Sequence, residues 1–193
     1  MTRYDDAISR IDANNGEDPT LVPADGAEMP AELAYGRRMS TALAALYPEA
    51  SEELRLACRA QHIRRWTLPR NAYPMDRPGY HRWRTELKDR HARLAGEIMR
   101  ECGYGDPQIA RVEQLIRKEN LKRDGEAQAL EDVACIVFLT HYIEEFAAKH
   151  DDAKLTGILR KTWGKMSDRG HKAAAQIGLP DRVGKLLAEA LAG

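Results

Sequence analysis

Two histidines and one aspartate carry the donor atoms that a divalent metal ion needs. His62, His91 and Asp132 lie in three different segments that we expect to be core helices. Imidazole nitrogens and a carboxylate that converge on an open position suit a single Mn, Fe, Zn or Mg ion. They show no local spacing such as His-x-x-x-His, so the alternative is two polar histidines at helix edges and no cofactor. We predict a metal site made of these three residues.

Arginine and lysine side chains cluster near the same segments. The stretch 60–66 joins a histidine to two adjacent arginines and a tryptophan. Guanidinium groups bind phosphate and carboxylate through paired hydrogen bonds. The alternative is that these cations lie on solvated helix faces beside matching acids. The predicted phosphate-binding residues are Arg38, Arg64, Arg65, Arg82 and Lys118, and the pocket around them adds Tyr35, Gln61, Trp66 and Asp76.

Aromatic residues alternate with arginines in the segment 73–80. Tyr73 and Tyr80, together with Trp83, could stack a nucleobase beside the arginines. The competing interpretation, which we favour, is a loop that its own aromatic residues pin to the core.

Composition limits the classes of function. Lys plus Arg and Asp plus Glu each number 30, so net charge gives no reason to expect bulk nucleic-acid binding. The three cysteines are far apart, without a Cys-x-x-Cys pair, which indicates free thiols in a reducing compartment. No apolar run approaches the roughly 18–20 residues of a membrane span, and no signal-peptide pattern opens the chain. We therefore expect a cytoplasmic protein with no membrane contact.

The elements that must position these residues are helices. Apolar residues recur at helical spacing, and Thr2 and Ser51 are suited to cap two of the runs. Prolines and glycines make 17–29 and 67–79 two long ordered loops, and no strand pattern is evident. The chain length suits one domain spanning 1–193. We predict an all-α, single-domain bundle of roughly seven to nine helices. The expected helices lie near residues 3–14, 30–47, 51–66, 80–101, 106–120, 126–149, 154–167, 169–176 and 180–191.

Five segments resemble one protein family along nearly the whole chain. These segments identify the chain as similar to the domain of unknown function 4202 family. This resemblance adds no chemistry of its own. The segments are Tyr-Gly-Arg-Arg-Met at 35–39, Ala-Gln-His-Ile-Arg-Arg-Trp at 60–66, Tyr-Pro-Met-Asp-Arg-Pro-Gly-Tyr at 73–80, Leu-Ile-Arg-Lys-Glu-Asn at 115–120 and Leu-Glu-Asp-Val-Ala-Cys at 130–135.

The order of these segments also resembles the HD phosphohydrolase superfamily. The resemblance implies an HD-like all-helical fold with an early His, a His-Asp pair, auxiliary histidines and a late Asp around one or two metals. Tyr35 stands where the early His is expected, and Asp132 resembles the late Asp. Gln61-His62 stands where His-Asp is expected if Ile63 fixes the register, and a shift by one residue pairs His62 with Ile63 instead. The standard metal set is altered in either register.

Three functions remain open on these grounds. The first is a divergent HD-like protein that binds a phosphate-containing small molecule, as a metal-assisted phosphohydrolase of a nucleotide or phosphate ester. The second is a non-catalytic nucleotide- or anion-binding module on the same scaffold. The third, which zero net charge disfavours, is a helical domain that binds RNA or protein. The sequence does not choose between enzyme and binding module, and it does not identify the substrate, the oligomeric state or the catalytic residues.

Overall fold

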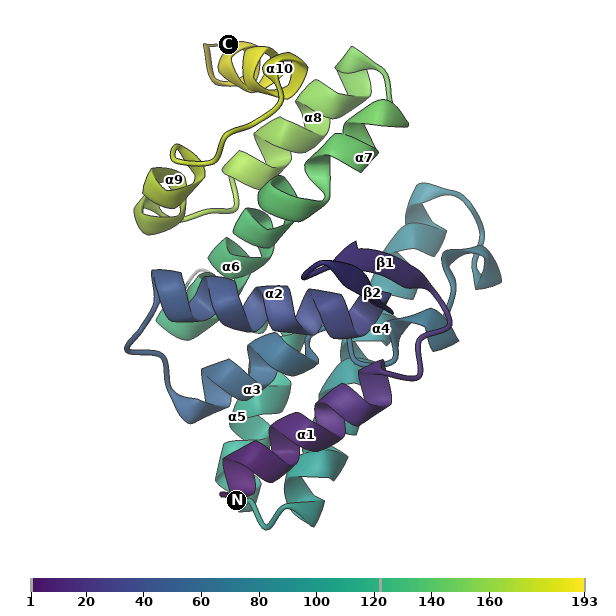
Figure 1. The fold of residues 1–193 in the computed structure, drawn as a ribbon, viewed down its shortest axis with the longest axis vertical. Helices are drawn as coiled ribbons and strands as arrows, with labels where there is room; N and C mark the ends of the chain where they lie inside the picture. Colours follow the sequence, from purple (N-terminus) through teal and green to yellow (C-terminus); the bar gives the residue numbers. More distant parts are fainter. Residues whose placement is uncertain (1, 122, 193) are drawn as a thin grey trace.

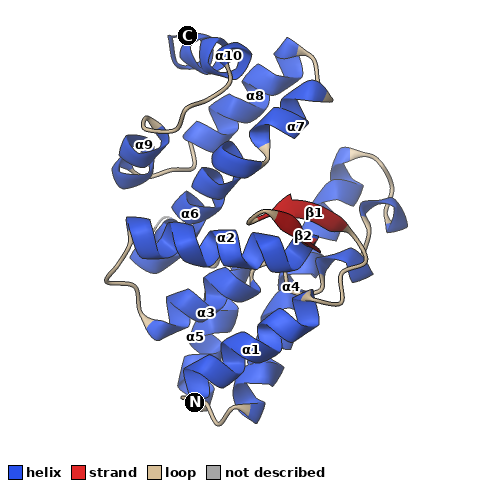
Figure 2. Cartoon of the chain, in the orientation of Figure 1, coloured by secondary structure: helices blue, strands red, loops and turns tan. Residues whose placement is uncertain are grey.

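The computed structural model describes residues 2–121 and 123–192, and its regular structure is almost entirely helical (Figures 1 and 2). These residues form ten α-helices, two 3-10 helices and one two-stranded hairpin, which confirms the predicted all-α class. No helix among them is long and apolar enough to cross a membrane. The α-helices are α1 (Arg3–Asn15), α2 (Ala31–Leu46), α3 (Glu52–Ala60), α4 (Arg77–Glu101), α5 (Asp106–Arg117), α6 (Gly125–His141), α7 (Ile143–Ala148), α8 (Asp152–Trp163), α9 (Asp168–Ala174) and α10 (Asp181–Ala192).

The described residues contain more α-helices than the seven to nine expected, because the segment 126–149 is divided. Tyr142, with φ −126° and ψ −15°, leaves the helical conformation between α6 and α7. The Arg38 guanidinium on α2 donates a 3.0 Å hydrogen bond to the Tyr142 hydroxyl. The break therefore turns this side chain toward α2.

The first expected loop, 17–29, contains a β-hairpin, so the prediction of no strands was wrong. Strands β1 (Leu21–Ala24) and β2 (Ala27–Pro30) pair antiparallel. Asp25 and Gly26 join them at φ 51° and 80°, the positive values that a tight two-residue hairpin turn requires. Prolines in both strands hide the pattern, because proline cannot donate to a ladder and is confined to edges.

The second expected loop, 67–79, contains two short 3-10 helices and the start of α4. They are η1 (Arg65–Thr67) and η2 (Arg70–Ala72). Helix α4 begins before Tyr80, because the Asp76 carboxylate accepts a 2.7 Å hydrogen bond from the Gly79 backbone and Pro78 occupies the first turn.

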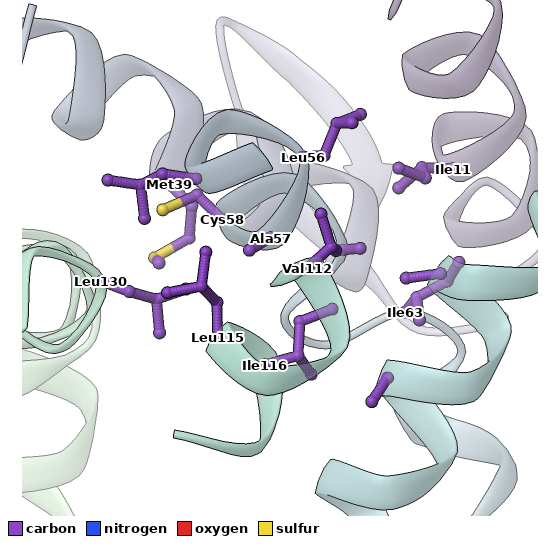
Figure 3. Packing of buried hydrophobic residues seen from close by; sticks show 14 of the residues in the cluster. Ile11, Met39, Leu56, Ala57, Cys58, Ile63, Val112, Leu115, Ile116 and Leu130 are labelled. Atoms are coloured by element: carbon purple, nitrogen blue, oxygen red, sulfur yellow. The ribbon is translucent and has the colours of Figure 1, made fainter. Parts of the chain in front are cut away.

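The hydrophobic core has two clusters that share α6. The larger joins helices α1 through α5 with the part of α6 between Ala127 and Val137, and Figure 3 shows some of its side chains. The smaller joins the second half of α6 to α7, α8, α9 and α10. Figure 1 shows α6 running from one group of helices to the other. The start of α2, the end of α3 and the middle of α4 meet on the larger cluster, and the candidate site lies there.

Candidate functional site

A tight turn after α3 carries His62. Helix α3 ends at Ala60 instead of continuing to Trp66 as expected, and the turn places Arg64 at φ 51°, in the left-handed region. The Arg64 backbone N–H donates a 3.0 Å hydrogen bond to the side chain of buried Asn15, at the end of α1. This bond and the buried side chain of Ile63 fix the path of the turn.

The His62 imidazole packs against two side chains of α2. Its ring stacks on Tyr35 with centroids 4.0 Å apart and planes at 11°. Its Nδ1 lies 3.4 Å from Oε2 of Glu32, and 26% of the side chain is exposed. The Tyr35 hydroxyl donates a 3.3 Å hydrogen bond to the Gln61 side chain. Tyr35, Gln61 and His62, all predicted from the sequence, therefore form one contact.

His91 lies beside His62 with one ring nitrogen that has no partner. Its Nδ1–H donates a 2.7 Å hydrogen bond to the Ile63 carbonyl, so the proton is on Nδ1. Burial, and then the proximity of His62, lower the pKa of His91 to about 3, so the ring is neutral and Nε2 is a bare acceptor. Nε2 has no hydrogen-bond partner among the described residues. The two rings lie 6.0 Å apart.

Three cations influence the protonation of His62. Burial lowers the pKa of His62 well below its ordinary value, and Arg65, Lys118 and Arg84 lower it further. Nη1 of Arg65 lies 3.8 Å from Glu32. Burial raises the pKa of Glu32 to about 7, although Arg65 opposes this shift. The site thus combines a neutral imidazole with nearby positive charge.

Lys118 forms an ion pair with Glu131. It ends α5 at φ 59°, and its ammonium pairs with Glu131, which Lys165 also approaches at 3.4 Å. Burial raises the pKa of Glu131, but Lys118 and Lys165 together lower it below its ordinary value. Because Glu131 offsets its charge, Lys118 contributes less net attraction than Arg65 and Arg84.

Asp132 belongs to a different network. It is fully buried, and Oδ1 accepts hydrogen bonds from the Gln128 amide at 2.9 Å and from the Ser167 backbone at 2.8 Å. Oδ2 accepts from the Tyr47 hydroxyl at 2.5 Å and from the Ser167 hydroxyl. Ser167 is the N-cap of α9, so Asp132 joins α6 to that helix and to the end of α2.

The metal ligands predicted from the sequence are therefore only partly brought together. His62 and His91 are neighbours, whereas the oxygens of Asp132 are occupied by the donors that hold α9. Among the described residues, no group of three or more His, Cys, Asp or Glu side chains is arranged to hold a metal ion. These donors do not fit a metal in this geometry, and the metal itself stays a prediction for measurement.

The other predicted residues occupy varied positions. Arg38 holds the hairpin through the Pro23 carbonyl at 3.0 Å as well as contacting Tyr142. Arg64 directs its guanidinium to Asn14 and Glu17 at the end of α1 and over the ring of Trp66. Arg82 is exposed and forms no hydrogen bond or ion pair with the described residues, and Asp76 caps α4.

The sequence-based selection missed Glu32, Arg84 and Tyr142. Glu32 precedes Tyr35 by three residues, a spacing that places both on one helix face, so this spacing was the available signal. Arg84 precedes His91 by seven residues, again on one face. Tyr142 follows the most apolar helix and gave no local signal.

Comparison with known proteins identifies the family but no characterised relative. No curated protein and no solved structure matches the chain. A family model described as "Domain of unknown function (DUF4202)" matches residues 5–187. The matched range covers nearly all of the 193 residues, so the chain belongs to this family.

Proposed function

We propose that the cluster around His62 binds a phosphate-containing small molecule. The observation that carries this proposal is that half-buried His62 and Arg65 both approach Glu32, at 3.4 and 3.8 Å, while the charges of Lys118 and Arg84 also act on the imidazole. Cations gathered beside a neutral hydrogen-bonding ring attract an anion and can hydrogen-bond its oxygens.

Arg65 and Arg84 supply the charge for this ligand. Arg65 approaches Glu32 only at 3.8 Å and lies over the Trp83 ring at 5.4 Å, which orients its guanidinium. Arg84 is exposed, and its one described hydrogen bond is a 3.4 Å contact with the Tyr80 hydroxyl. A phosphate displaces little when it binds these groups, because Arg84 has no carboxylate partner among the described residues and Arg65 has only the 3.8 Å contact with Glu32.

We also propose that the bundle is a divergent HD-like fold. Support comes from chain order: Tyr35 on α2, His62 after α3 and His91 on α4 meet at one place, as the early His, the His-Asp pair and the auxiliary histidine would. Asp132, which the resemblance equates with the late Asp, holds α9 instead.

Hydrolysis of the bound phosphate ester is the second candidate function. The observation that favours it is Nε2 of His91, a buried acceptor beside His62 without a partner among the described residues. A neutral imidazole nitrogen can accept a hydrogen bond from the attacking water and so orient it toward the phosphorus. Because the donor set does not fit a metal ion, we derive no step through one.

Thermal unfolding with a ligand panel tests the binding proposal. The probes are inorganic phosphate, pyrophosphate, AMP, ATP and glucose 6-phosphate, and a ligand at one hundred times its Kd raises the melting temperature by about 5–10 °C. Arg84→Gln should weaken this binding about tenfold or more, since a hydrogen bond to a charged group is worth about 1.5–3 kcal/mol. Arg100→Gln is the matched control, an exposed arginine near the other end of the same helix, and should leave binding unchanged.

Two results would contradict the proposal. One is the absence of any shift across the panel, and the other is an equal loss of binding in Arg100→Gln and Arg84→Gln, which would indicate nonspecific attraction. Phosphate release from the ligands that bind, measured with and without Mn²⁺ or Mg²⁺, then separates hydrolase from binding module. Salt-dependent retention of RNA in place of these ligands would support the nucleic-acid alternative.

A further inference from the structure

A cavity of about 340 Å³ lies beside the turn that carries His62, between that turn and the middle of α4. The turn contributes Ile63, Arg64, Thr67 and Leu68 to its lining. Helix α4 contributes Leu87, Arg90, His91, Arg93 and Leu94, whose spacing places them along one side of the helix. His91 borders both this cavity and the site described above, but neither His62, Glu32, Arg65 nor Arg84 lines the cavity, so the cations that line it are different ones.

The lining is both basic and apolar. Three of its nine residues are arginines and none is an acid, while four are Ile or Leu. Arg64 is partly neutralised by Glu17 at 3.2 Å. Arg90 is half-buried, Arg93 is exposed, and neither forms a hydrogen bond or ion pair with the described residues. Arginine beside branched apolar side chains matches a ligand with an anionic end and an apolar body.

We propose that this cavity is a second binding site, for a small organic carboxylate with an apolar body. The carboxylate pairs with Arg90 and Arg93, whose forked guanidinium groups suit two oxygens in one plane. The apolar body lies against the branched side chains of both walls. The volume is near the lower end of the 300–1,000 Å³ that ligand pockets usually span, so the site suits an aryl or short acyl acid.

Matched ligands test the two halves of this proposal on the wild-type protein. Benzoate and octanoate have both features, acetate has no apolar body, and benzyl alcohol has no charge. In NMR titrations of isotope-labelled protein, we expect benzoate to bind at least about tenfold more tightly than acetate or benzyl alcohol. Resonances of the lining residues in the turn and in α4 should move most.

Variants of α4 test the location. The double change Arg90→Gln, Arg93→Gln should weaken benzoate binding about tenfold or more, since it removes two charged donors. Arg100→Gln is the matched control, because Arg100 is an exposed arginine of the same helix outside the cavity. The circular dichroism melting curve shows that each variant folds.

Several results would overturn the proposal. They are absence of binding by both benzoate and octanoate, equal binding of benzoate and benzyl alcohol, and undiminished binding in the double variant. Loss of benzoate binding in Arg84→Gln would assign the ligand to the His62 cluster instead. Because Arg84→Gln tests the phosphate site and the double variant tests this cavity, failure of either proposal leaves the other one standing.

Discussion

Asp132 accepts four hydrogen bonds in a fully buried position, so replacing it should unfold part of the link between the two clusters of the core. The donors are the Tyr47 hydroxyl, the Gln128 amide, and the backbone and hydroxyl of Ser167. Asp132→Ala removes all four bonds and leaves the donors without an acceptor. At about 1 kcal/mol for each bond, we expect the free energy of unfolding to fall by about 4 kcal/mol.

Asp132→Asn separates hydrogen bonding from charge. The amide oxygen can still accept from Gln128 and Ser167 at the Oδ1 position, and the hydroxyls near Oδ2 can rotate to accept from the amide N–H. We therefore expect about half the loss, about 2 kcal/mol, in urea denaturation followed by circular dichroism. Asp89→Asn is the control, because Asp89 forms an exposed ion pair with Arg117 and should cost less than about 1 kcal/mol.

This reasoning fails if Asp132→Ala costs less than about 1 kcal/mol. It also fails if EDTA destabilises the wild-type protein as strongly as the substitution does, because the carboxylate would then act through a bound cation. Metal content measured by elemental analysis after purification without chelator tests the predicted ion directly. A stoichiometric metal that is lost in His62→Ala and in Asp132→Ala would restore the site that the sequence predicted.

Three further predictions concern the pH dependence, the turn and α9. Burial raises the pKa of the Glu32 carboxyl from 4.5 to about 7, so it stays protonated in the folded protein at pH values where the unfolded chain ionises, and the wild-type protein loses stability as pH rises through this window. The free energy of unfolding of Glu32→Gln should therefore exceed that of the wild type by an amount that grows to about 3 kcal/mol between pH 4.5 and 8. A difference that does not change with pH, as expected for the exposed Glu28→Gln, would refute this. Residue 64 has φ 51°, a conformation that glycine adopts more readily than alanine. In urea denaturation the free energy of unfolding of Arg64→Gly should therefore exceed that of Arg64→Ala by about 1 kcal/mol, and the reverse order would contradict this conformation. A Cβ at Gly170 would lie 2.8 Å from Oδ1 of Asp132, so Gly170→Ala should cost about 2 kcal/mol in the same assay, while Gly184→Ala, with no neighbour within 4 Å, should be neutral or stabilising.

Helical spacing and capping residues predicted most of the fold. Thr2 forms a capping box with Asp5, and the Ser51 side chain accepts from the Leu54 backbone, as the sequence indicated. The hairpin was missed because two prolines outweighed the Asp-Gly pair at 25–26, the strongest short signal for a two-residue turn. The break at Tyr142 could not be predicted, because apolar periodicity continues across it.

The candidate site was predictable only where residues share a helix face or a short segment. His62 and His91 were both selected, and the structure places their rings side by side. Their meeting with Glu32 depends on the left-handed residue at position 64, a conformation that sequence rarely signals when the residue is not glycine. Asp132 was selected because it resembles the late Asp of the HD pattern, but its partner Ser167 lies 35 residues away and gave no signal.

Tyr35 and the two adjacent arginines of the turn explain the shape of the site. The Tyr35 ring covers one face of His62, and the Tyr35 hydroxyl donates a hydrogen bond to Gln61. The two adjacent arginines of the turn then take different parts. Arg64 turns back to the end of α1, where Asn14 and Glu17 hold its guanidinium, whereas Arg65 approaches Glu32 beside His62. One residue in the left-handed conformation separates these two directions, so the phosphate site we propose depends on Arg65, while Arg64 maintains the turn and borders the second cavity.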